Sequence, residues 1–355
     1  MAKQVVYVRK KIRKTPYILF YIYLLFALLC MFTVASYTWF TLSWSPQVSG
    51  MNVYITSNTG LELASTPDAK VWSNQLNIYS TEELKKYADS EMKPALRQAT
   101  WSDKDQCFYG PLYGYDGRLI DIMRKDADNR PIISWYKLED LIHANSMASS
   151  NYYIKATFYA RCGQPVGVML AEPMAVDSQG TQGAGTYVIG EPNTGKGPET
   201  AVRVGFRITD VDENGSALSE PGPMYVYEPN ADRHVDGSMD PIATYSVDDF
   251  LYEKPLIVDG EVQFRPLVEK ERLIRQTFSK KGEPGEFLEN PPLFDLNAKE
   301  IVKIELYIWL EGQDVDCSNA MSDGVTTTLI EANIQFTGTT ESQSGMTRLP
   351  GSNDE

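Results

Sequence analysis

Apolar and polar residues alternate strictly in several segments of this chain. In residues 300–311 every second position is apolar, and the polar residues Lys303 and Glu305 lie on the opposite face. The same period of two appears in residues 152–161, 201–209 and 332–336, and more weakly in residues 51–55, 61–64, 166–170 and 224–227. This alternation is typical of strands that bury one face. It predicts a mainly β protein in which two sheets pack face to face as a β-sandwich.

Helical patterns are short and few. Ser80 and Glu83 have the spacing of a capping box, which predicts a helix over residues 81–88. Further helices are expected over residues 138–144 and near residues 268–278. A helical insertion is therefore expected near residues 80–150. Stretches rich in Gly, Pro and Asp are expected to form surface loops, notably residues 172–197 and 229–240.

One long apolar segment stands near the start of the chain. No charged residue lies between Lys14 and Glu62, and residues 17–40 are almost wholly apolar. About 20 apolar residues suffice for a helix to cross a bilayer. Basic residues preceding such a segment stay cytoplasmic, which places the rest of the chain outside. The segment is either a retained single-pass anchor or a signal peptide cleaved after Ala35 or Ser36.

These patterns divide the chain into four parts. Residues 1–14 are expected to be a basic cytoplasmic segment and residues 15–43 a transmembrane or signal helix. Residues 44–339 form the exported body, which we expect to be a single elaborated domain. The polar residues 340–355 are expected to be a disordered tail.

Charge is distributed unevenly along the chain. Six of the 33 basic residues precede the apolar segment, so the remaining 27 face 47 acidic residues, a net charge of about −20. Such an acidic body repels the phosphate backbone of nucleic acids, which excludes them as expected partners. Aromatic residues make up 11% of the chain, which favours pleated sheet.

The sequence contains little that is typical of catalysis. It has two histidines, His143 and His234, and lacks the HExxH, G-x-S-x-G, P-loop and Rossmann motifs. Asp232 and Asp236 flank His234 and are placed to orient it or to share a metal with it. A solvated loop histidine is the simpler interpretation. We therefore expect no catalytic residue, no cofactor and no enzymatic activity.

The segment containing Asp210, Asp212, Asn214 and Gly215 begins like a calcium-binding loop. An EF-hand would need a glutamate at the twelfth position, where this chain has Pro221. Because Asn-Gly directly after a strand is a strong hairpin signal, a turn is favoured over a calcium site. Asp314 and Asp316 invite the same two interpretations.

Four cysteines are present, of which Cys30 lies in the apolar segment. Export permits a disulfide among Cys107, Cys162 and Cys317, but the sequence does not choose between the three pairings. The alternative is that all three are small buried hydrophobic residues.

Three stretches together resemble a known group of proteins. ASYTWFTLSWSPQVSGMNVYITSNTGLELA is similar to the start of the mature region in TasA and camelysin-type proteins of Gram-positive bacteria. NYYIKATFYARCGQPVGVML, IELYIWLEGQDVDC and TLIEANIQF resemble strands of uncharacterised clostridial surface proteins. The resemblance implies an exported, jelly-roll-like sandwich, which in the best-known members assembles into fibres of the biofilm matrix.

These observations favour a non-enzymatic structural or interaction protein of the cell envelope. Its expected partners are the lipid bilayer and either copies of itself or other envelope proteins. If cleavage frees residues 37–42, this strand candidate can pair with the open sheet edge of a neighbouring subunit. The alternative function is a membrane-anchored ligand- or carbohydrate-binding module that uses exposed aromatic residues such as Trp101, Trp135 and Tyr113.

Overall fold

The computed structural model divides the chain into two compact units, Met1–Trp44 and Ser45–Glu355. It describes residues 21, 23–26, 28, 31, 48–58, 60–84, 96–111, 135–139, 152–175, 184–191, 198–233, 256–258, 261–263, 267–279, 282–312, 314, 317 and 328–339. The predicted cytoplasmic segment, most of the apolar segment and the predicted tail lie outside these residues. In the first unit the described residues are helical, and among all described residues no helix meets the length and hydropathy needed to span a membrane.

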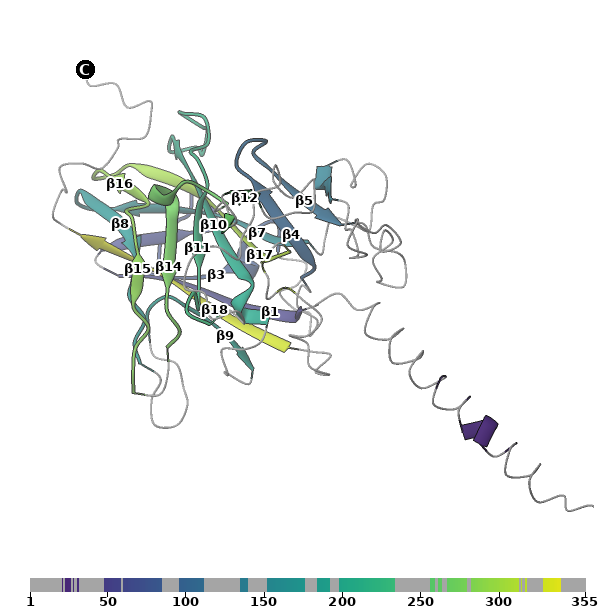
Figure 1. The fold of residues 1–355 in the computed structure, drawn as a ribbon. Helices are drawn as coiled ribbons and strands as arrows, with labels where there is room; N and C mark the ends of the chain where they lie inside the picture. Colours follow the sequence, from purple (N-terminus) through teal and green to yellow (C-terminus); the bar gives the residue numbers. More distant parts are fainter. Residues whose placement is uncertain are drawn as a thin grey trace, which may run out of the picture. The chain divides into compact units, whose positions relative to one another are not determined.

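The second unit is mainly β and contains two mixed sheets (Figure 1). At the centre of the smaller sheet, which we name sheet A, β18 (Thr328–Thr339) pairs in parallel with β1 (Val48–Ser57). The remaining described strands of sheet A are β3 (Gln75–Asn77), β8 (Val166–Leu170), β9 (Tyr187–Glu191) and β16 (Phe294–Leu296).

The larger sheet, sheet B, is built around β17 (Ile301–Glu311). This strand pairs antiparallel with β10 (Val202–Val211) on one edge and with β7 (Tyr153–Cys162) on the other. Beyond these lie β2 (Leu61–Ala64), β4 (Gln98–Ser102), β5 (Cys107–Pro111), β6 (Trp135–Lys137), β11 (Tyr225–Glu228), β14 (Leu273–Gln276) and β15 (Phe287–Glu289). A separate hairpin joins β12 (Leu256–Val258) to β13 (Glu261–Gln263).

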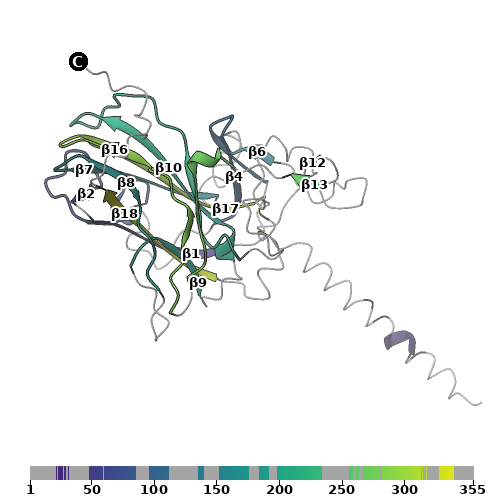
Figure 2. The same cartoon turned by 60° about the vertical axis from the view of Figure 1, so that its left-hand side comes forward.

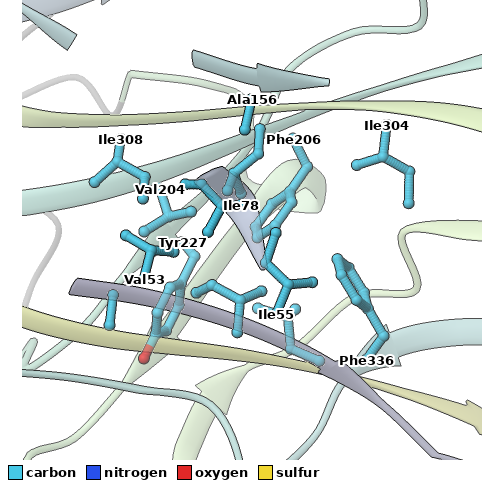
Figure 3. Packing of buried hydrophobic residues seen from close by; sticks show 14 of the residues in the cluster. Val53, Ile55, Ile78, Ala156, Val204, Phe206, Tyr227, Ile304, Ile308 and Phe336 are labelled. Atoms are coloured by element: carbon cyan, nitrogen blue, oxygen red, sulfur yellow. The ribbon is translucent and has the colours of Figure 1, made fainter. Parts of the chain in front are cut away.

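The main hydrophobic core lies between sheets A and B, as in a β-sandwich. Figure 3 shows Val53 and Ile55 of β1 and Phe336 of β18 meeting Val204 and Phe206 of β10. Alternate residues of β7 are buried along its whole length, as the sequence pattern predicts. Each large side chain moved from water into such a core contributes about 1.5–3 kcal/mol.

A second cluster covers part of the opposite face of sheet B. In the turned view of Figure 2, β4 lies beside β17, with which it pairs. Phe108 of β5 stacks on Tyr153 with ring centroids 4.5 Å apart and meets the edge of Trp309 at 5.2 Å. Both faces of sheet B are therefore buried where this cluster covers it.

The predicted helices are corrected at two places, whereas Leu138 and Glu139 of the predicted helix 138–144 are helical. Near residues 268–278 the structure has a short 3-10 helix (Lys270–Arg272) followed by strand β14. Leu273 and the adjacent Ile274 belong to opposite hydrophobic clusters, as neighbours on a strand do. Within residues 80–150 the structure describes strands β4, β5 and β6.

The predicted capping box is not formed. A 3-10 helix (Ile78–Ser80) ends where the predicted helix begins, and residues 81–84 form a turn. The Thr157 hydroxyl donates to Glu83 Oε1 at 2.5 Å, so Glu83 binds the edge of β7 instead. Residues 85–88 lie outside the described chain, as do residues 140–144. Part of the predicted loop 172–197 is a strand, β9, which pairs with β18.

Candidate functional site

A group of buried charged side chains lies at one end of sheet B and is centred on Arg203, at the start of β10. Its guanidinium donates through Nη2 to Glu228 Oε1 at 2.9 Å and to Asp314 Oδ2 at 2.5 Å. Nη1 donates to the carbonyl oxygens of Thr200 and Val202 at 2.9 and 3.0 Å. Arg203 is therefore held by both carboxylates and backbone.

Strand register brings further charges to the same place. Arg203 lies opposite Trp309, and Glu228 lies opposite Arg275. Arg275 Nε lies 3.4 Å from Glu228 Oε2, and the indole of Trp309 donates to Glu311 Oε2 at 2.9 Å. We name this group the Arg203 cluster; its members are Arg203, Glu228, Arg275, Glu311 and Asp314.

The Arg203 cluster is closed to solvent. The Arg203 and Glu228 side chains are each 1% exposed and that of Asp314 is 0% exposed. Burial opposes the charged form of Arg203, but Glu228 and Asp314 outweigh it and raise its pKa. A guanidinium that stays protonated cannot act as a general base. This arrangement joins β10, β11 and the residues after β17.

The sequence pattern did not identify this cluster. Arg203 alternates with apolar residues, a pattern that by itself indicates a solvent-facing position on β10. The available signal was on β17, where Tyr307 and Trp309 occupy the supposedly polar face. Large aromatic residues on this face of β17 indicate that another part of the chain covers it, and both are buried in the second cluster.

The calcium candidate forms a turn. Asp212 Oδ1 accepts hydrogen bonds from the backbone N–H groups of Asn214 and Ser216 at 2.9 and 2.7 Å. These bonds lower the pKa of Asp212. Gly215 has φ +82°, a conformation that glycine adopts without strain. Burial, with a smaller contribution from Glu300, raises the pKa of Asp210. Among the described residues, no three His, Cys, Asp or Glu side chains form a group that could hold a metal ion.

Several predicted site residues cannot be placed. His143, His234, Asp236, Asp316 and Tyr113 lie outside the described residues. Of the residues around His234, Asp232 accepts a hydrogen bond from the backbone N–H of Phe278 at 2.6 Å.

The cysteines and two of the aromatic candidates are core residues. Cys107, Cys162 and Cys317 are buried, and no disulfide joins them. Trp101 is 2% exposed and Trp135 is 6% exposed. The alternative in which these two tryptophans are exposed is therefore wrong.

No protein-family model, no curated protein and no solved structure matches this chain significantly. The resemblance to TasA and camelysin-type proteins rests on the quoted segments alone.

Proposed function

We propose that this chain is a single-pass, non-enzymatic structural or interaction protein of the cell envelope, with its acidic β body outside. The observation that carries the proposal is the apolar surface of the helix in the first unit. Its described helical residues expose large apolar side chains: Tyr21, Tyr23, Leu24, Leu25, Phe26, Leu28 and Met31.

These side chains surround the helix. Tyr23, Leu24, Leu25 and Phe26 are consecutive, and successive residues of an α-helix point about 100° apart. Each is at least 46% exposed. A helix that is apolar all round requires an apolar environment, which the hydrocarbon of a bilayer supplies.

The distribution of charge along the chain supports the proposed orientation across the membrane. The six basic residues before the apolar segment favour a cytoplasmic N-terminus, and the body carries the acidic excess. The Arg203 cluster supports a structural role, because Arg203 pairs with Glu228 and Asp314 inside the fold. We extend the proposal to the jelly-roll-like arrangement and the self-assembly that the TasA resemblance implies, with the bilayer and further copies or other envelope proteins as partners.

Alkaline extraction of membranes from expressing cells tests the anchor. The full chain should stay in the membrane pellet. Replacing Leu24 and Leu25 together by lysine should release it, because each lysine near the centre of a membrane helix costs about 2.5–3.5 kcal/mol. The matched control places the same two charges before the segment, by Ala2→Lys and Gln4→Lys, and should stay in the pellet. Release of the unchanged, uncleaved chain by alkali would overturn the anchor.

The mass of the recovered protein separates the two forms of the proposal. An intact N-terminus means that the segment is a retained anchor. A new N-terminus at Ser36 or Tyr37 means that it is a cleaved signal, and the body is then a secreted protein of the cell surface.

A further inference from the structure

The first and last described strands of the body, β1 and β18, are neighbours in sheet A and run in the same direction. Nine register pairs join β1 to β18, from Val48 opposite Thr328 to Ser57 opposite Phe336. The chain therefore enters β1 beside the start of β18. It leaves β18 at Thr339, beyond the other end of the shared ladder. Figure 1 shows the two strands side by side.

This geometry determines how tension along the chain acts on the sheet. Tension pulls β1 toward its own start and β18 toward its own end, so the two strands are forced to slide lengthwise in opposite directions. The hydrogen bonds of a sheet run across the strands. Lengthwise sliding therefore loads all nine pairs together, whereas pulling both strands apart from one end breaks them in turn.

The core side chains of β1 oppose the same movement. Met51, Val53 and Ile55 are 0%, 4% and 1% exposed and pack in the main core. Because side chains alternate between the faces of a strand, a slip of one residue would carry all three out of the core. A slip of two residues would first have to break the whole ladder.

The outer edges of both strands are held as well. β18 pairs with β9 along Leu329–Asn333 and with β8 along Phe336–Thr339. β1 pairs with β3 at Tyr54, Ile55 and Thr56. A force applied at either strand is therefore passed to the rest of sheet A.

We propose that the parallel β1–β18 ladder is a mechanical clamp, and that the body resists tension applied between its N-terminal end and the residues after Thr339. The inference deepens the proposed function, because a membrane anchor before β1 fixes one end of the chain. Attachment of the other end to a second envelope component then places the ladder under shear.

Single-molecule stretching of the full chain in detergent micelles tests the clamp. In the first geometry the chain is held by peptide tags at its N- and C-termini. In the second the C-terminal tag is replaced by a tag inserted directly before Thr328, so that the same ladder opens from one end. An unchanged melting temperature verifies that the tagged protein folds. The rupture force should be several-fold higher in the first geometry, and equal forces would overturn the clamp.

A matched pair of core variants locates the resistance. Ile55 of β1 and Ile274 of β14 are 1% and 0% exposed in the same core. Ile55→Ala and Ile274→Ala should both lower the melting temperature, since both leave a cavity. Only Ile55→Ala should lower the rupture force between the terminal tags. An equal loss of force in Ile274→Ala would assign the resistance to the core as a whole and refute the clamp.

These force measurements do not depend on where the protein resides in the cell. A chain that resists force but is released from membranes by alkali would refute the anchor alone. A membrane-held chain with equal forces in both geometries would refute the clamp alone.

Discussion

At the scale of single residues, burial decides how much stability is lost when one partner of an ion pair is removed. Arg203 lies 2.5 Å from Asp314 with both side chains almost fully buried. The Arg161–Glu62 pair is almost as short, at 2.8 Å, but its two side chains are 40% and 47% exposed. Removing one partner of a buried pair leaves a charge without compensation inside the protein, whereas a surface charge is solvated by water.

Arg203→Met should therefore destabilise the body by about 3–5 kcal/mol. Arg161→Met removes the same kind of side chain from the exposed pair with Glu62 and should cost about 0–1 kcal/mol. Chemical unfolding of the full chain in detergent, followed by tryptophan fluorescence, measures both. Similar losses in the two variants would contradict the closed, buried character of the Arg203 cluster.

Asp103 and Asp210 should make the stability of the fold depend on pH in opposite directions. Burial alone would raise the pKa of Asp103, but hydrogen bonds from Arg272 at 2.9 and 2.8 Å lower it. A carboxyl with a lowered pKa stabilises the fold above its unfolded pKa of about 3.9, and this contribution is lost as pH falls through the folded pKa. The raised pKa of Asp210 has the opposite sign, because there the folded state binds the proton more tightly.

Asp103→Asn should therefore lower the melting temperature at neutral pH, with a loss that shrinks in acid. Asp210→Asn should raise it at neutral pH, with a gain that disappears as pH falls through the raised pKa. Melting curves of both variants and of the unchanged chain, recorded at a series of acidic pH values, check the direction of each change in melting temperature. A destabilising effect of Asp210→Asn at neutral pH would contradict the assigned environment.

At the scale of elements, segments with a strict period of two were predictable as strands. The pattern in residues 201–209 and 300–311 corresponds to β10 and β17, even though most residues of β10 are buried on both faces. In contrast, β4 and β5 were not predicted as strands, and every residue of both is buried. The Asn-Gly signal after β10 predicted the turn at Asp212 because a hairpin turn is a local feature. The Arg203 cluster joins residues more than a hundred positions apart and has no local signature.

The alternation in β17 makes a direct prediction. Leu306 is 0% exposed and lies between Phe206 of β10 and Ala156 of β7 in the register. Leu306→Ala should cost about 2–5 kcal/mol through lost burial and a residual cavity. Lys303→Ala changes the opposite face of the same strand and should cost about 0–0.5 kcal/mol. Equal unfolding free energies for the two variants would mean that the inward face has been assigned wrongly.

At the scale of the whole molecule, sequence and structure give different kinds of information about the chain. Composition and patterning divide it into a basic N-terminus, an apolar segment and an acidic body. The structure describes how the body folds into two sheets and shows a first unit whose described residues are helical and apolar on the outside. The parallel pairing of the first and last strands was not predictable, because no sequence pattern records which distant strands become neighbours.

The central claim is that the body stands outside a membrane in which the N-terminal segment is held. Protease added to intact, wall-stripped cells tests this most directly, with an epitope tag at each end of the full chain and a cytoplasmic protein as the control for lysis. The account predicts that the C-terminal tag is lost while a small fragment carrying the N-terminal tag stays protected. A body that survives on intact cells, and is digested only after they are lysed, would contradict it.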